Sequence, residues 1–289
     1  MSKTYGSQSM VAPLQTVLVR RPNESFGKAD PERWHYTARP NLTTAVAEHN
    51  QFVQTLHQFG AEVVYHDAPL PDHADAIFVH DPVIICDQGA IILQMGKLLR
   101  RGEETAVAAT LQKMGIPIHY QLHDTATAEG GDLLWLDEAT LVVGQGFRTN
   151  AEGLRQLREA LEPSGVELIP VQLPYYYGPE ACLHLMSFIS MVADDLAVVY
   201  APLMPVPFWQ LLQARGVQFV EVPASEFDSL GPNVLALAPR HCLMLRDNAI
   251  TKQRLEAAGC TVLTYQGDEI SLKAEGGATC LTRPILRQY

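Results

Sequence analysis

A recurring pattern of helix, glycine and strand most constrains how this chain can fold. In five places a stretch of helical periodicity ends at a glycine and a β-rich segment follows directly. The five glycines are Gly60, Gly115, Gly165, Gly216 and Gly259, at intervals of 55, 50, 51 and 43 residues. A left-handed glycine commonly closes a helix, and a β-branched run after it is typical of a buried strand. Five units at near-even spacing indicate an internal repeat.

Pairs of apolar runs lie between these units and are interpreted as hairpins. The pairs are 83–86 with 90–93, 133–136 with 141–143, and 234–237 with 242–245. The predicted fold is therefore α/β, a closed propeller of five β/α units with pseudo-five-fold symmetry. An open doubly wound sheet is the alternative, but it gives no reason for a hairpin in every unit. We expect residues 1–289 to form a single catalytic domain.

The stretch from Pro22 to Pro40 departs from this regularity. It shows little periodicity over 19 residues, and long loops within a compact domain commonly serve as lids. Because the stretch contains Phe26, Trp34 and Tyr36, we expect 22–40 to form a lid over a pocket.

Composition excludes several classes of partner. The chain carries 21 Lys and Arg against 32 Asp and Glu, a net charge of −11, and has no basic block. This balance argues against nucleic acid or an anionic membrane as a partner. We find no apolar run of membrane-spanning length and no signal-peptide pattern at the start. Five cysteines without a CxxC pair predict a reducing, cytoplasmic location.

Unexpected polar residues recur at one phase of the repeat, where each hairpin begins. Counted forward from the repeat glycines, they are Asp75 with Asp81, Glu129, His184, Asn233, and Glu275, which opens the EGGATC segment ending at Cys280. In a closed ring these points meet on the axis. The spacing therefore predicts that Asp75, Asp81, Glu129, His184 and Cys280 share one cavity.

Each of these residues, taken alone, has a simpler interpretation. A histidine between leucines is usually a hydrogen-bonded core residue, and a lone cysteine in a strand context usually packs as a small apolar group. We interpret Cys86, Cys182, Cys242 and Cys260 in that way. The shared phase separates the five predicted site residues from such cases.

The predicted group of residues suits one type of chemistry. Cysteine with histidine is a common nucleophile and acid/base pair. Three nearby carboxylates would disfavour a peptidase, whose oxyanion needs hydrogen-bond donors, but they would suit a planar guanidinium cation. We therefore expect Asp81, Glu129 and also Asp75 to hold a guanidinium group. Cys280 would attack its central carbon, and His184 would protonate the departing amine and then activate water.

The same carboxylates should affect the resting nucleophile. One negative charge about 6 Å from the sulfur raises the thiol pKa by roughly two units at an effective dielectric near 20. We therefore expect Cys280 to rest as a thiol until a cation binds.

At these residues the sequence resembles the pentein superfamily of guanidino-modifying enzymes. It is most similar to dimethylarginine dimethylaminohydrolases and arginine deiminases. The segments that carry the resemblance are 75–81 (DAIFVHD), 129–132 (EGGD), 147–150 (FRTN), 183–185 (LHL) and 276–280 (GGATC).

The resemblance implies a role for each matching residue. Cys280 would be the nucleophile, His184 the acid/base and Glu129 its acidic partner. Asp75 and Asp81 would bind the guanidinium, while Arg148 and Arg100, with Arg101 as the alternative to Arg100, would hold the substrate α-carboxylate. The family needs neither a metal nor an organic cofactor.

The expected activity is hydrolysis of arginine or an Nω-methylated arginine, giving citrulline plus ammonia or an alkylamine. The alternatives are an arginine deiminase or an amidinotransferase of the same superfamily, and a non-catalytic protein that binds arginine-like cations. The expected partner is a small cationic guanidino substrate, and the assembly considered is a homodimer. One departure from the family pattern is His80 before Asp81, where relatives more often carry an acidic or other residue.

Overall fold

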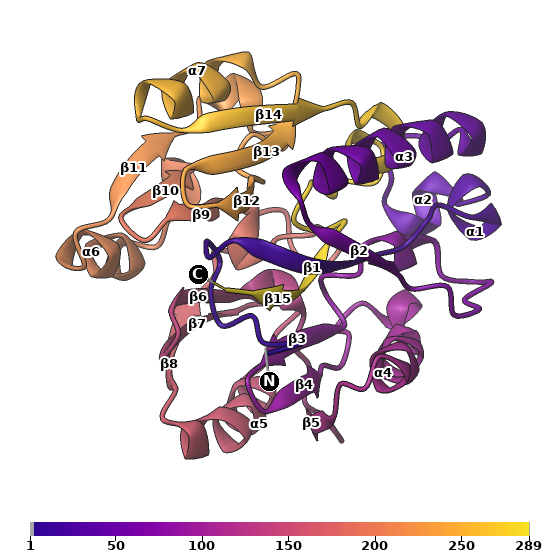
Figure 1. The fold of residues 1–289 in the computed structure, drawn as a ribbon, viewed down its shortest axis with the longest axis horizontal. Helices are drawn as coiled ribbons and strands as arrows, with labels where there is room; N and C mark the ends of the chain where they lie inside the picture. Colours follow the sequence, from indigo (N-terminus) through magenta and orange to yellow (C-terminus); the bar gives the residue numbers. More distant parts are fainter. Residues whose placement is uncertain (1–2, 289) are drawn as a thin grey trace.

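The computed structural model describes residues 3–288, which form five three-stranded sheets arranged in a ring (Figure 1). In every sheet two antiparallel strands are joined by a third strand that runs parallel to the middle one, and in four of the five sheets the antiparallel pair is consecutive in the chain. The predicted five-unit α/β propeller is confirmed.

The strands group by sheet. The first sheet contains β1 (Leu14–Val19), β2 (Glu62–Tyr65) and β15 (Arg283–Arg287). The second contains β3 (Val83–Cys86), β4 (Gly89–Ile92) and β5 (Ile118–Gln121). The third contains β6 (Leu133–Asp137), β7 (Thr140–Gln145) and β8 (Glu167–Gln172). The fourth contains β9 (Ile189–Ala193), β10 (Leu196–Val199) and β11 (Gln218–Glu221). The fifth contains β12 (Leu235–Ala238), β13 (His241–Leu245) and β14 (Thr261–Tyr265).

One main helix connects the second and third strands of each repeat. These helices are α3 (Leu42–Phe59), α4 (Glu103–Lys113), α5 (Ala151–Leu161), α6 (Val206–Ala214) and α7 (Ala249–Ala257). All five repeat glycines follow these helices with positive φ angles, from +77° at Gly115 to +104° at Gly60. The helix, glycine and strand pattern seen in the sequence therefore corresponds to one structural unit.

The last strand of the chain closes the ring by pairing with the first. Strand β15 is antiparallel to β1, with Leu18 opposite Arg283 and Val17 opposite Pro284. Figure 1 shows the yellow β15 beside the indigo β1, at the centre of the molecule. Because of this pairing, the segment just before β15 lies beside segments from the first two-thirds of the chain.

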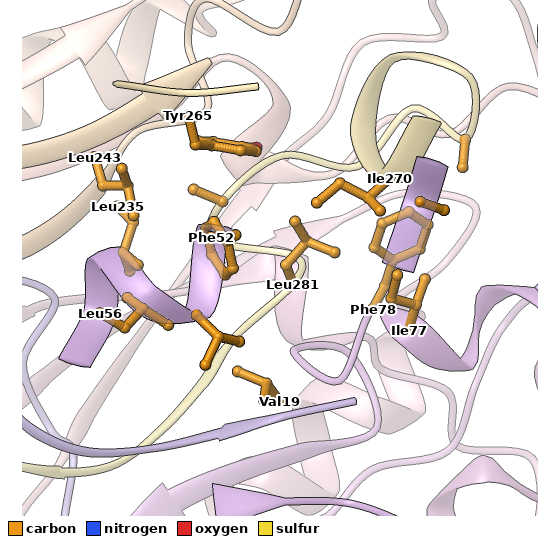
Figure 2. Packing of buried hydrophobic residues seen from close by; sticks show 14 of the residues in the cluster. Val19, Phe52, Leu56, Ile77, Phe78, Leu235, Leu243, Tyr265, Ile270 and Leu281 are labelled. Atoms are coloured by element: carbon orange, nitrogen blue, oxygen red, sulfur yellow. The ribbon is translucent and has the colours of Figure 1, made fainter. Parts of the chain in front are cut away.

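One core cluster includes apolar residues from the two segments that carry Asp81 and Cys280. Phe52 of α3 packs edge-on against Tyr265 with ring centroids 4.9 Å apart (Figure 2). The same cluster contains Phe78, three residues before Asp81, and Leu281, next to Cys280. Burial of these apolar neighbours fixes the backbone on which the polar side chains stand.

The 22–40 segment is more ordered than its sequence suggested. It contains two one-turn helices, α1 (Glu24–Gly27) and α2 (Pro31–Trp34). Phe26, Trp34 and Tyr36 are buried and belong to the core cluster around α3. The short helices were missed because a single turn shows no periodicity, while Asn23 and Asp30 cap them with side-chain hydrogen bonds.

Within residues 3–288, no helix has the length and apolar character needed to cross a membrane.

The glycine after α6 provides a test of the repeat. Gly216 has φ +78°, and a Cβ added there would meet no atom within 4 Å. We expect Gly216→Ala to lower the free energy of unfolding by about 1 kcal/mol, because only backbone conformation is strained. Gly216→Asn should cost less, since asparagine tolerates this conformation. Urea unfolding measures both changes, and equal costs for the two variants would contradict the explanation.

Candidate active site

The predicted site residues all lie just before the strand of a sheet that runs antiparallel to its middle strand, which we call the inner strand (β3, β6, β9, β12 or β15). Asp75 lies in a 3₁₀ turn over Ala74–Ile77, Asp81 two residues before β3, Glu129 before β6, and His184 before β9. Cys280 precedes β15 by three residues. The four polar residues are buried and Cys280 is half-buried. Hydrogen bonds and charges connect members from different sheets.

Glu129 and His184 form a direct pair. His184 Nε2 lies 2.7 Å from Glu129 Oε2. With the Nε2 hydrogen donated to Glu129, Nδ1 is the ring nitrogen left for proton transfer. Gly131 of the EGGD motif is needed for this arrangement, because a Cβ there would lie 2.4 Å from His184 Nδ1.

The rest of EGGD and FRTN holds the histidine segment in place. Asp132 accepts hydrogen bonds from the Leu185 backbone N–H at 2.9 Å and from the Thr149 hydroxyl at 2.7 Å. The Glu129 backbone N–H donates in turn to Thr149 Oγ1 at 3.2 Å. These two motifs therefore act together to position His184.

The pair is charged in the resting protein. Burial by itself would raise the pKa of Glu129, but the hydrogen bond and charge of His184 bring that pKa far below its usual range. Burial would lower the pKa of His184, yet its acidic neighbours, Cys182, Asp132 and Glu129, raise it well above the usual value. An imidazolium beside a carboxylate is the form that can give a proton to a leaving amine.

Asp81 connects two sheets. One of its oxygens accepts from the Gly131 backbone N–H at 3.0 Å, and the other lies 2.5 Å from Arg100 Nη1. Burial opposes ionisation, but the charges of Arg100 and His184 lower the Asp81 pKa below its usual value. Asp81 is therefore an ionised carboxylate at the centre of the cluster.

Asp75 is held by two groups outside the predicted set. Tyr36 donates to one carboxylate oxygen at 2.7 Å, and Lys97 Nζ donates to the other at 2.6 Å. Lys97 also donates through Nζ to the Trp34 carbonyl and through its backbone N–H to Glu129 Oε1. Lys97 was missed because it follows β4, the middle strand of its sheet, away from the phase of the repeat at which the other site residues lie.

Arg100 lies inside the protein and not at a pocket surface. Its side chain is 4% exposed, and it donates to Asp81, Glu103 and the Phe78 carbonyl. These contacts use Nε and both terminal nitrogens, so Arg100 braces Asp81 in this structure. Its neighbour Arg101 is exposed.

Arg148 of the FRTN motif is differently placed. Its Nη1 lies 3.6 Å from Glu129 Oε1, beyond hydrogen-bond distance. The predicted cluster of carboxylates is thus balanced by cations: Asp75 by Lys97, Asp81 by Arg100, and Glu129 by His184 and Arg148. A cationic substrate meets acidic groups that already have partners.

Cys280 is surrounded by groups that suppress its ionisation. Burial and the charge of Asp81 raise the pKa of the Cys280 thiol to about 11, although Asn233 and His184 act in the opposite direction. Asn233 Nδ2 lies 3.3 Å from the sulfur. The expectation of a resting thiol agrees with this geometry. Asn233 stood at the right repeat phase in the sequence but was left out of the predicted cluster.

The remaining cysteines divide into two groups. Cys86, Cys242 and Cys260 are buried, as expected for packing residues. For Cys182 that expectation was wrong, because its side chain is exposed and its sulfur lies 3.8 Å from His184 Nδ1. The apolar neighbours in the sequence hid a turn that exposes this residue.

His80, the residue before Asp81, is a buried histidine beside the site. Its ring is buried, Nδ1 lies 2.8 Å from the Thr282 carbonyl, and burial lowers its pKa to about 3. A neutral ring therefore lies next to Asp81.

No group of three or more His, Cys, Asp or Glu side chains in the described part of the chain could hold a metal ion.

Comparison with known proteins decides the family. The profile described as "N,N dimethylarginine dimethylhydrolase, eukaryotic" matches residues 23–287. The chain belongs to this family. A curated relative, the N(G),N(G)-dimethylarginine dimethylaminohydrolase of Streptomyces coelicolor, is 29% identical over 280 residues, which are 96% of this chain and 99% of the relative.

Solved structures show the same pentein fold. The product-bound N-terminal domain of ArgZ, a cyanobacterial arginine dihydrolase, superposes with a TM-score of 0.80 at 20% identity, covering 94% of this chain and 97% of that one. A cysteine-to-serine variant of the Pseudomonas aeruginosa dimethylarginine dimethylaminohydrolase, complexed with citrulline, gives 0.78 at 22% identity, covering 94% and 99%. These TM-scores show that both structures share the overall fold of this chain.

The resting thiol gives a test on this site. Without ligand, the rate constant for alkylation of Cys280 by iodoacetamide should rise about tenfold per pH unit from pH 7 to 10, because only the thiolate reacts. Peptide mass spectrometry separates Cys280 from Cys182, and a Cys182→Ser background serves as the control. A rate constant that levels off below pH 8 would show that the Cys280 pKa is not raised.

Proposed function

We propose that this chain is a hydrolase that acts on the guanidinium carbon of arginine or Nω-methylated arginine, giving citrulline plus ammonia or an alkylamine. The observation that carries the proposal is the ion pair between His184 and Glu129 in one cluster with Cys280 and Asp81. This cluster supplies a nucleophile, a proton donor and a carboxylate for the cation, and the family profile agrees with this chemistry.

The proposed reaction begins when the guanidinium binds beside Asp81. The bound cation offsets the negative charge of that carboxylate, and the Cys280 thiol loses its proton to solvent. The thiolate attacks the guanidinium carbon and forms a C–S bond. His184 then gives a proton to the departing nitrogen as the C–N bond breaks, which leaves an S-alkylthiouronium on Cys280.

The second half of the reaction uses the same histidine in its neutral form. His184 takes a proton from water as the water oxygen attacks the thiouronium carbon. The C–S bond breaks, and the ureido product leaves with the thiolate restored and reprotonated. Glu129 keeps the imidazole oriented through Nε2 in both halves, so that Nδ1 exchanges the proton.

Substrate binding requires groups beyond these three residues. We propose that Asp81 holds the guanidinium and that Asp75 contributes with its partners Tyr36 and Lys97. For the α-carboxylate we propose Arg148 together with Arg101, because Arg100 already donates to protein groups on all three of its nitrogens. The segment 22–40, which places Tyr36 against Asp75, is the proposed lid.

A substrate panel tests the proposal. We expect citrulline, with ammonia or the matching alkylamine, from at least one of arginine, monomethylarginine and dimethylarginine, with agmatine as a further probe. Cys280→Ser should abolish turnover, with Cys182→Ser as the matched control that keeps most of it. Mass spectrometry of the product and an amine assay provide the measurement.

The outcomes separate the alternatives. Release of ammonia from arginine, with no turnover of the methylated arginines, would identify a deiminase. A new guanidino compound formed when glycine is added would identify amidino transfer. Binding of arginine without any product would identify a cation-binding protein. Absence of a ureido product from all four compounds would exclude the hydrolase.

A further inference from the structure

The amide of Asn233 is the one group that donates a hydrogen bond to the Cys280 sulfur among residues 3–288. Nδ2 lies 3.3 Å from Sγ, and Asn233 is 9% exposed. Asn233 precedes β12, so it comes from the one sheet that otherwise supplies no polar group to the cluster. With it, each of the five sheets contributes a side chain.

The orientation of this amide follows from its other contact. Asn233 Oδ1 lies 3.0 Å from the Thr279 backbone nitrogen, which can only donate. The carbonyl oxygen must therefore face Thr279, and the NH₂ group must face the sulfur of the next residue. One side chain thus holds both the backbone and the thiol of the nucleophile segment.

The side chain is also held rigidly. A Cβ at Gly277 would lie 2.5 Å from Asn233 Cγ, so the second glycine of the GGATC segment lets the amide lie directly against the backbone. The Asn233 backbone N–H donates to the Leu230 carbonyl at 2.9 Å. A donor fixed before the reaction stabilises developing charge without the cost of reorienting.

The charges around the sulfur show why such a donor matters. Asp81 and burial disfavour the thiolate, while the charge of His184 favours it. His184, however, loses its charge when it protonates the leaving amine. Asn233 carries no titratable proton, so its donor faces the sulfur throughout the cycle.

We propose that Asn233 is a catalytic residue of this site, whose amide N–H holds the Cys280 thiolate when it attacks and again when it departs from the thiouronium carbon. This role rests on the proposed hydrolase for its place in turnover. The effect on the thiol itself requires no substrate, and the experiment exploits this difference.

The experiment compares Asn233→Ala and Asn233→Asp with the unmodified protein. Asn233→Asp has nearly the same shape and keeps an acceptor for Thr279, but it replaces the donor at sulfur with a negatively charged oxygen. We expect the rate constant for iodoacetamide alkylation of Cys280 at pH 9 to fall about tenfold in the alanine variant and further in the aspartate variant. Turnover should lose kcat in the same order, with KM changed less.

Asn248→Ala is the matched control, because Asn248 is a buried, hydrogen-bonded asparagine outside the site. It should lower stability without changing the alkylation profile. Circular dichroism checks the fold, and the aspartate variant serves if the alanine variant does not fold. Unchanged alkylation profiles in folded variants would overturn the role of Asn233, whereas a substrate panel without ureido product would overturn only the hydrolase.

Discussion

The pairing of the last strand with the first is the contact on which the whole site depends. Cys280 stands three residues before β15, and β15 is held in the ring by β1. The cluster beneath it ties Leu281 to Phe52 of α3 and to Phe78 near Asp81. Loss of this closure would separate the nucleophile from Asp81 and from the pair of Glu129 and His184, although these three residues would remain on intact sheets.

Charge balance is the second constraint. The cluster contains three carboxylates, but cations from the protein compensate them in the resting state, with Lys97 on Asp75 and Arg100 on Asp81. The thiol nevertheless remains protonated, because it is partly removed from solvent and Asp81 lies close to it. A bound guanidinium adds the positive charge that this balance lacks at the sulfur. The proposed substrate therefore promotes ionisation of the thiol that attacks it, whereas the thiol remains protonated in the absence of substrate.

The sequence predicted the parts of this arrangement that depend on chain periodicity. The repeat glycines located five helix ends, and the phase of the repeat brought Asp81, Glu129, His184 and Cys280 together. The directions of side chains could not be predicted in this way. Spacing along the chain does not show that Arg100 points inward to Asp81 or that Lys97 reaches Asp75 from a different segment. For the same reason the exposed Cys182 was mistaken for a packing residue.

The central claim is that Cys280, and not the cysteine beside His184 Nδ1, becomes covalently linked to the substrate carbon. Rapid acid quenching during turnover, followed by digestion and mass spectrometry, tests it most directly. The account predicts an adduct of the guanidino carbon and its amino-acid side chain on the peptide that contains Cys280, with Cys182 unmodified. An adduct on Cys182 would contradict the claim. So would the absence of an adduct on either cysteine under conditions in which a step after C–N cleavage limits turnover.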